Sequence, residues 1–154
     1  MDLAALGIYG TCFLLAYLSA VFPFVNAEVV LLGYVVAGGS EWREALIFAA
    51  IVAVGQMVGK ATMYWAGRGV ARVPSERTRR SLARWEERLA RSPRSVFLFI
   101  FVSASTGFPP FYALSVLLGT LRIHFLGFFV VGLLGRLVRF SAIALFPAGL
   151  SKLW

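Results

Sequence analysis

Cysteine and histidine are almost absent from this chain. Cys12 is the only cysteine and His124 the only histidine among 154 residues. A single cysteine excludes an intrachain disulfide and a cluster of metal-binding thiolates, and one histidine leaves little for acid–base hydrolysis. The sequence also has no glycine-rich phosphate loop and no Gly-x-Ser-x-Gly elbow. We therefore expect a protein that is not an enzyme and uses no metal or cofactor.

Charged residues are also scarce. They make up 14% of the chain, whereas 60% is hydrophobic and the mean hydropathy is +0.82. A soluble domain of this length needs more polar surface, so the composition indicates a protein whose solvent is lipid. The formal charge is nevertheless +8, and nine of the fifteen basic residues fall between Arg68 and Arg94. Because these residues lie beside apolar spans, they favour anionic lipids over nucleic acid as partners.

Apolar spans cover most of the sequence. Residues 3–21 carry no charge, and at 1.5 Å per residue they just cross a hydrocarbon core of roughly 30 Å. The chain begins without the basic residues of a signal peptide, so we expect this span to be retained. Longer spans follow at 45–66 and 125–146, after a polar turn at 38–44 in the first case. We therefore predict that residues 1–154 form a single membrane domain.

One short pattern occurs twice, at a constant offset of 86 residues. Residues 22–33 read FPFVNAEVVLLG and residues 108–119 read FPPFYALSVLLG, with seven of twelve positions identical. In both copies a proline, Pro23 or Pro109, stands where an apolar helix would otherwise continue. A repeated helix break at membrane depth points to the binding site of a transporter.

The two breaks leave apolar arms that are too short to cross a bilayer. The arm 27–37 is about 16 Å long as a helix, and the arms 95–106 and 111–121 are similar. We therefore predict two re-entrant hairpins, whose broken backbone must be satisfied by protein or water. The break residues are Pro23, Asn26, Thr106, Pro109 and Pro110. The polar side chains expected to satisfy the backbone are Asn26, Ser103, Ser105, Thr106 and Tyr112. The alternative for these side chains is direct contact with the substrate.

A basic segment separates the two halves. In residues 75–91, apolar residues recur at helical spacing beside a face of arginines, which predicts an amphipathic interfacial helix. The positive-inside rule places residues 68–95 in the cytoplasm, so the hairpins open to opposite sides. The predicted fold is an all-α integral membrane protein: an inverted repeat of a re-entrant hairpin plus a transmembrane helix, in residues 3–67 and 95–147.

The sequence resembles the DedA family, also called the VTT or SNARE-associated-Golgi domain superfamily. The residues that carry the resemblance are Pro23, Glu28 and Gly33, then Gly55-x3-Gly59-x4-Tyr64-x2-Gly67-Arg68-x3-Arg72, then Phe108-Pro109-x9-Gly119. The resemblance implies opposed re-entrant hairpins and movement of lipids, such as undecaprenyl phosphate or phospholipids, between leaflets. Many members carry an Arg-x-x-Pro-x-x-Arg arrangement at the second break, whereas residues 103–111 contain no basic residue here.

Glu28 is the strongest candidate for a functional residue. A carboxylate in an apolar arm costs roughly 2.5–3.5 kcal/mol at the centre of a membrane helix. It therefore needs a cationic partner, a water-filled cavity or a bound proton. In the functional interpretation it binds a proton or pairs with a cation along the substrate path. The alternative is a structural ion pair, or a position nearer the interface.

Three cations lie within the long apolar spans: Lys60, Arg136 and Arg139. Arginine binds phosphate oxygens in a bidentate manner, whereas lysine acts as a point charge. A cavity with Glu28 on one side and these cations on the other would receive a lipid phosphate. For Lys60 the alternative is that its side chain extends to the interface near Tyr64 and Trp65.

Other polar and small residues have simpler interpretations. Gly55-x-x-x-Gly59 lets a helix approach closely, either within the chain or from a second copy in a homodimer. We expect Gln56 to form an interhelical hydrogen bond, Cys12 to pack in the interior and His124 to lie in a solvated turn.

Three functions are compatible with these features. The first is a DedA-like transporter or flippase of a bacterial plasma (inner) membrane that moves a lipid phosphate, with or without proton coupling. The second is a transporter or channel for a small ion or solute on the same fold. The third is a non-transporting, membrane-organising protein in which residues 75–91 matter more than the hairpins.

Overall fold

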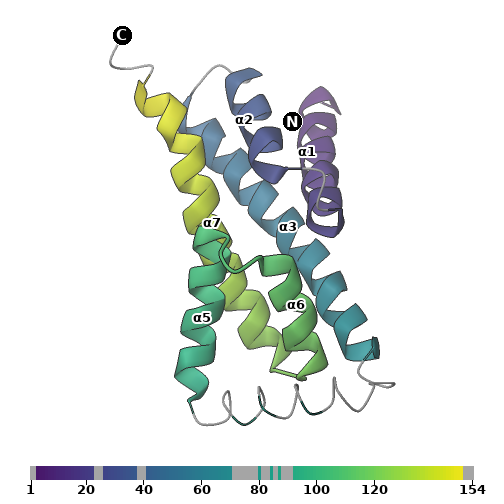
Figure 1. The fold of residues 1–154 in the computed structure, drawn as a ribbon. Coiled ribbons are helices and arrows are strands. Elements are labelled where there is room, and N and C mark those ends of the chain that lie inside the picture. The colour runs from purple at the N-terminus through teal and green to yellow at the C-terminus, as the bar shows by residue number, and fades with distance from the viewer. Residues whose placement is uncertain are drawn as a thin grey trace. The chain divides into compact units, whose positions relative to one another are not determined.

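Helices form all of the regular structure that is described for the chain. The computed structural model describes residues 3–22, 26–37, 41–70, 80, 84, 87 and 92–150. Six helices have bounds in these ranges: α1 Leu3–Val21, α2 Ala27–Ala37, α3 Trp42–Val70, α5 Pro93–Thr106, α6 Phe111–Thr120 and α7 Phe125–Leu150 (Figure 1). By length and composition, two spans in these ranges could cross a membrane, Trp42–Gly69 and Phe125–Phe146.

The helix bounds follow the predicted arms closely, with corrections in α3 and α7. The arm 27–37 coincides with α2, but α3 begins at Trp42, within the predicted turn 38–44, and continues to Val70, past the predicted end at residue 66. The helix starts early because the Ala45 N–H bonds the Glu41 carbonyl at 3.0 Å, and because Glu44 suits the positive end of the helix dipole. The last helix was predicted to end at residue 146, but α7 continues through Pro147 to Leu150.

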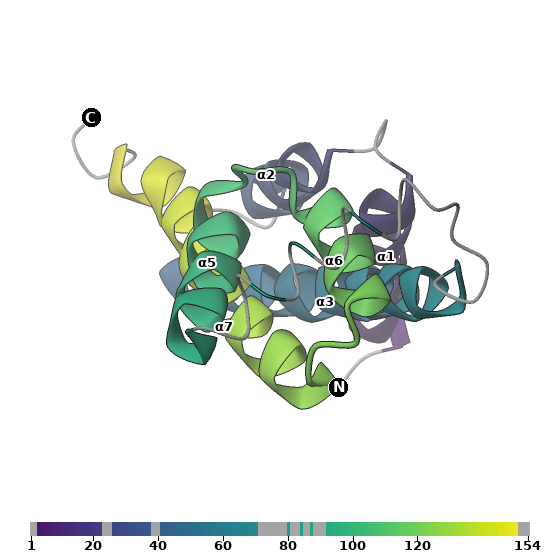
Figure 2. The ribbon, with the colours of Figure 1, turned by 60° about the horizontal axis from the view of Figure 1, so that its bottom comes forward.

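The chain divides into two compact units. The first contains Met1–Gly59 and Arg136–Trp154, and the second contains Lys60–Gly135. The long helices α3 and α7 each contribute one segment to each unit, and both divisions fall immediately before a cation. In the first unit α1 contacts α2, and in the second α5 contacts α6. Figure 2 shows the loop that joins α5 to α6. The predicted repeats 3–67 and 95–147 stay a prediction.

Close approach of two helix backbones organises the first unit. A Cβ atom at Gly55 would lie 2.8 Å from the Phe13 carbonyl oxygen, and one at Gly59 would overlap the Ala20 side chain. Between the same helices, α3 and α1, Gln56 Nε2 donates to Ser19 Oγ at 2.7 Å. The predicted interhelical bond of Gln56 is therefore confirmed. The structure also shows that the glycine pair packs within the chain.

The second unit is built around an equally close contact between α3 and α6. A Cβ at Gly67 would overlap the backbone of Val116, and one at Gly119 would overlap the backbone of Tyr64. Thr120 Oγ1 adds a hydrogen bond to the Gly67 carbonyl at 3.2 Å. In the first copy of the repeated pattern, Gly33 occupies the place of Gly119, but it has open space around it. The two copies are therefore packed differently.

Tyr64 and Trp65, the aromatic residues near the expected interface, differ in burial. The side chain of Tyr64 is fully buried, whereas that of Trp65 is exposed. The Tyr64 hydroxyl donates to the Ile123 carbonyl, and its ring stacks on Phe128 at a centroid distance of 5.2 Å. A buried phenol requires such a polar partner.

The predicted amphipathic helix 75–91 lies mostly outside the described residues. Arg80, Arg84 and Glu87 are described and all three are exposed. Arg84 Nε donates to the Arg80 carbonyl at 3.4 Å, four residues earlier. Its cytoplasmic location stays a prediction.

Replacement of Gly59 by alanine tests the α1–α3 contact. Gly59→Ala should lower the free energy of unfolding by about 1–3 kcal/mol, because the new methyl group overlaps Ala20. The matched control is Gly33→Ala, where nothing lies within 4 Å and the better helix propensity of alanine should be neutral or slightly stabilising. Unfolding in detergent micelles measures both. Equal losses in the two variants would contradict the packing described.

Candidate functional site

Asn26 fixes the start of α2 and places Glu28 in its first turn. The Asn26 side-chain oxygen accepts the Glu28 N–H at 2.9 Å, and the Asn26 carbonyl accepts the Val30 N–H at 3.2 Å. This is the geometry of an N-cap residue. A carboxylate in the first turn also lies near the positive end of the helix dipole. The local sequence therefore favours both the helix start and the charge that follows it.

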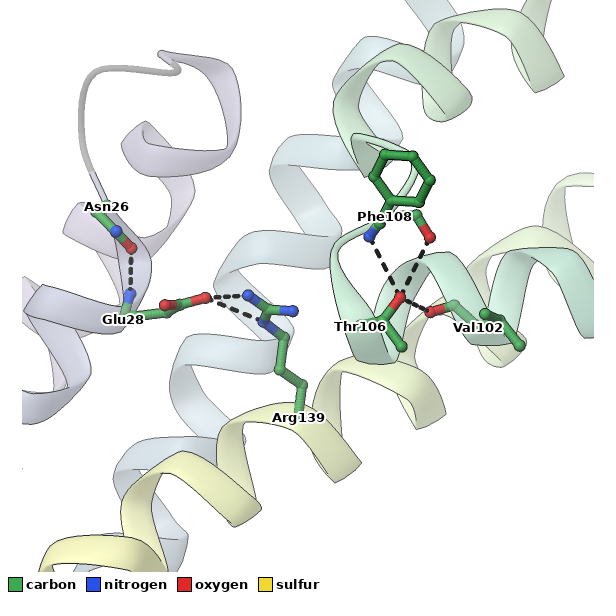
Figure 3. A network of polar contacts seen from close by, with 6 residues as sticks. All are labelled: Asn26, Glu28, Val102, Thr106, Phe108 and Arg139. Carbon is green, nitrogen blue, oxygen red and sulfur yellow. Dashed lines mark hydrogen bonds and ion pairs between the residues drawn. The ribbon is translucent and has the colours of Figure 1, made fainter.

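The Glu28 carboxylate pairs with Arg139 of α7. Arg139 Nε donates to Glu28 Oε1 at 3.1 Å, and Arg139 Nη2 donates to the same oxygen (Figure 3). The two residues are 111 positions apart in sequence and belong to the same compact unit. The Glu28 side chain is 36% exposed and the Arg139 side chain is 21% exposed. Of the three ways to accommodate Glu28, the fold supplies the cationic partner. Both side chains of the pair keep part of their surface exposed.

A second arginine lies one helical turn before Arg139. Arg136 is 8% exposed, and its guanidinium carbon lies 5.8 Å from the centroid of the Phe140 ring, where a cation–π attraction operates. Residues three apart are neighbours on a helix. The cluster of Glu28, Arg136 and Arg139 therefore carries one formal positive charge in excess, which suits an anionic ligand.

Lys60 belongs to the second unit. Its side chain is buried rather than extended to an exposed interface, with 5% of its surface exposed. Its Nζ lies over the ring of Tyr112 of α6, 6.0 Å from the centroid. The structure therefore joins Glu28 with Arg139 and neighbouring Arg136 in one unit, and describes Lys60 beside Tyr112 in the other.

The second break is held by side chains of α5. Gly107 ends α5 with a φ of 82°, which favours glycine, and its N–H bonds the Ser103 carbonyl. Thr106 Oγ1 accepts the Phe108 N–H at 3.2 Å and donates to the Val102 carbonyl at 2.7 Å (Figure 3). The N–H groups of Gly107 and Phe108 are thus satisfied locally, as a break at membrane depth requires.

The prolines of the break connect it to the next helix. Ser103 Oγ donates to the Pro109 carbonyl at 2.7 Å, and Pro110 is the N-cap residue of α6. Ser105 instead bonds the Phe101 carbonyl within its own helix at 2.8 Å. In the first break, Pro23 lies outside the described residues, and Asn26 caps α2 as described above.

The family model described as the VTT domain matches residues 22–148. The chain belongs to the VTT domain family. Both proline breaks, Glu28 and Arg139 lie within the matched range. The DedA resemblance noted in the sequence is therefore confirmed, and with two long apolar spans the protein is a VTT-domain membrane protein. Comparison with curated proteins and with solved structures found no match.

Two features of this VTT domain were not foreseen. The contact of Lys60 with Tyr112 joins residues 52 positions apart in sequence, and no periodicity connects them. The contact of Arg136 with Phe140 could have been found, because residues four apart lie on one face of a helix.

Among the described residues, no group of three or more His, Cys, Asp or Glu could hold a metal ion.

A double-mutant cycle tests the ion pair. Glu28→Gln and Arg139→Gln should each destabilise the protein, and the double variant should lose less than the sum, because each single change leaves a charge without its partner. We expect a coupling free energy of roughly 0.5–3 kcal/mol from unfolding in micelles. The control pairs Glu28→Gln with Arg43→Gln; Arg43 is exposed and lies over Trp42, so the effects should add. Additive effects in the Arg139 cycle would refute the pair.

Two buried serines allow a matched test of the second break. Ser103→Ala removes the bond to the Pro109 carbonyl and should cost about 1–2 kcal/mol in the free energy of unfolding. Ser115→Ala removes a bond to the Phe111 carbonyl within α6 and should cost less, because the helix ladder already uses that carbonyl. The same unfolding experiment compares them. A larger loss for Ser115→Ala would contradict the role of Ser103.

Proposed function

We propose that this VTT domain protein transports a lipid phosphate across the bilayer. The observation that carries the proposal is the Glu28–Arg139 pair, in which a short apolar arm and a long apolar helix share one ion pair. Charged residues within membrane segments are costly, and those that persist commonly mark a transport path. The substrate class we favour is undecaprenyl phosphate or a phospholipid.

The charges of the cluster suit a phosphate headgroup. Glu28 neutralises one of the two arginines, so Arg136 and Arg139 together keep one positive charge in excess. A guanidinium group binds two phosphate oxygens at once. When Glu28 takes up a proton, Arg139 loses its carboxylate partner and becomes available to the phosphate. This exchange provides a route for proton coupling.

The proposed architecture is the inverted repeat of two re-entrant hairpins, with residues 68–95 in the cytoplasm of a bacterial cell. Similar packing in the two units supports it. In the first, Ala20 of α1 meets Gly59 of α3; in the second, a Cβ at Gly135 of α7 would lie 2.7 Å from the Ala104 side chain of α5. In each unit the helix that would form the first arm of a hairpin therefore contacts a glycine of a long helix.

Reconstitution into liposomes tests the function. The wild-type protein should move labelled polyprenyl phosphate or phosphatidic acid between leaflets, with or without a pH gradient. Arg139→Lys should slow transport about tenfold or more, because lysine keeps the charge but loses the bidentate contact. Arg43→Lys, at an exposed arginine, is the matched control and should transport normally.

The alternatives give different results in the same assay. A wild-type protein that moves no labelled lipid under either condition refutes the proposal. Movement of a small ion or solute without lipid would identify the second function considered above. If Glu28→Gln leaves cellular function intact while Arg80→Gln with Arg84→Gln abolishes it, the membrane-organising function is correct.

A further inference from the structure

Lys60 and Tyr112 form a contact in the second unit that neither the repeated pattern nor the ion pair explains. Lys60 Nζ lies over the Tyr112 ring at 6.0 Å from its centroid, within the range of cation–π attraction. The lysine is 5% exposed, whereas Tyr112 is 51% exposed. The ring therefore lies against a buried ammonium group and itself reaches the surface.

The backbone of Tyr112 is held firmly although its ring is half exposed. Tyr112 is the second residue of α6, directly after the break that Ser103 fixes through the Pro109 carbonyl. The preceding residue, Phe111, is 3% exposed and stacks on Phe128 at 5.9 Å. Exposed side chains change rotamer readily. The Tyr112 ring can therefore move away from Lys60 without unfolding of α6.

We propose that Tyr112 is a movable cover over a phosphate-binding site whose charge is the Lys60 ammonium group. This inference rests on the proposed transport of a lipid phosphate and gives the chain a second place that binds the headgroup. A cation–π contact is weaker than charge-assisted hydrogen bonds to phosphate oxygens, so a phosphate displaces the ring. A headgroup without a phosphate charge does not, which makes Tyr112 a residue that determines specificity.

If Tyr112 covers Lys60, removal of the ring should change the rate at which the Lys60 amine reacts with a label. Lys60 and Lys152 are the two lysines of the sequence, so mass spectrometry after amine labelling of the full-length protein in micelles reports each one separately. Tyr112→Leu should raise the labelling rate of Lys60 several-fold relative to Lys152. Tyr112→Phe keeps an aromatic ring and should label at the wild-type rate. Equal labelling rates of Lys60 in the wild type and in Tyr112→Leu would contradict the covering role of Tyr112.

Protection from labelling tests the ligand. Short-chain phosphatidic acid should slow the labelling of Lys60, at a several-fold lower concentration in Tyr112→Leu than in the wild type or Tyr112→Phe. Protection by phosphatidic acid alone assigns the site to a lipid headgroup; equal protection by inorganic phosphate assigns it to the phosphate group itself. Protection by neither overturns the anion site. Because labelling requires no transport, the two proposals can fail separately. A protein that shows these changes in Lys60 labelling but moves no lipid would contradict the proposed transport and not the binding site at Lys60.

Discussion

The charged site of the first unit depends on one ion pair. Glu28 can lie in the apolar arm α2 because Arg139 of α7 supplies two donors to its carboxylate. Asn26 sets the helix start that positions the carboxylate. In the same unit, Gly55 and Gly59 of α3 allow α1 to pack closely against α3. The cap at Asn26 and the pair with Arg139 thus hold a charge in an apolar arm, where it would otherwise be costly.

The second unit meets a different requirement with a similar sequence. Its copy of the repeated pattern has Leu114 where the first has Glu28, so no carboxylate needs a partner there. The hydroxyl groups of Ser103 and Thr106 satisfy the broken backbone, and Gly119 packs against the backbone of Tyr64. The shared residues therefore specify a helix break, and the differing residues decide what chemistry the break supports.

Sequence reasoning predicted local features well and partners less well. The arm 27–37 and the break before Phe111 follow from proline, because it removes a backbone donor and disfavours helix at the preceding residue. The sequence limited the partner of Glu28 to three cations, but the choice of Arg139 depends on how α2 meets α7 in space. The burial of Tyr64 could not be predicted from the sequence, because its hydroxyl donates to the carbonyl of Ile123, 59 residues away. The contact of Lys60 with Tyr112 joins two helices for which no sequence pattern gives a register.

The ion pair can be measured directly in a bilayer. Solid-state NMR of protein with ¹³C-labelled glutamate and ¹⁵N-labelled arginine detects dipolar coupling between a carboxylate carbon and guanidinium nitrogens at hydrogen-bond distance. We predict a strongly coupled glutamate signal that disappears in Glu28→Gln and weakens in Arg139→Lys, while Arg43→Lys leaves it unchanged. A spectrum in which Glu28→Gln removes no coupled signal would contradict the charged pair on which the proposed transport depends.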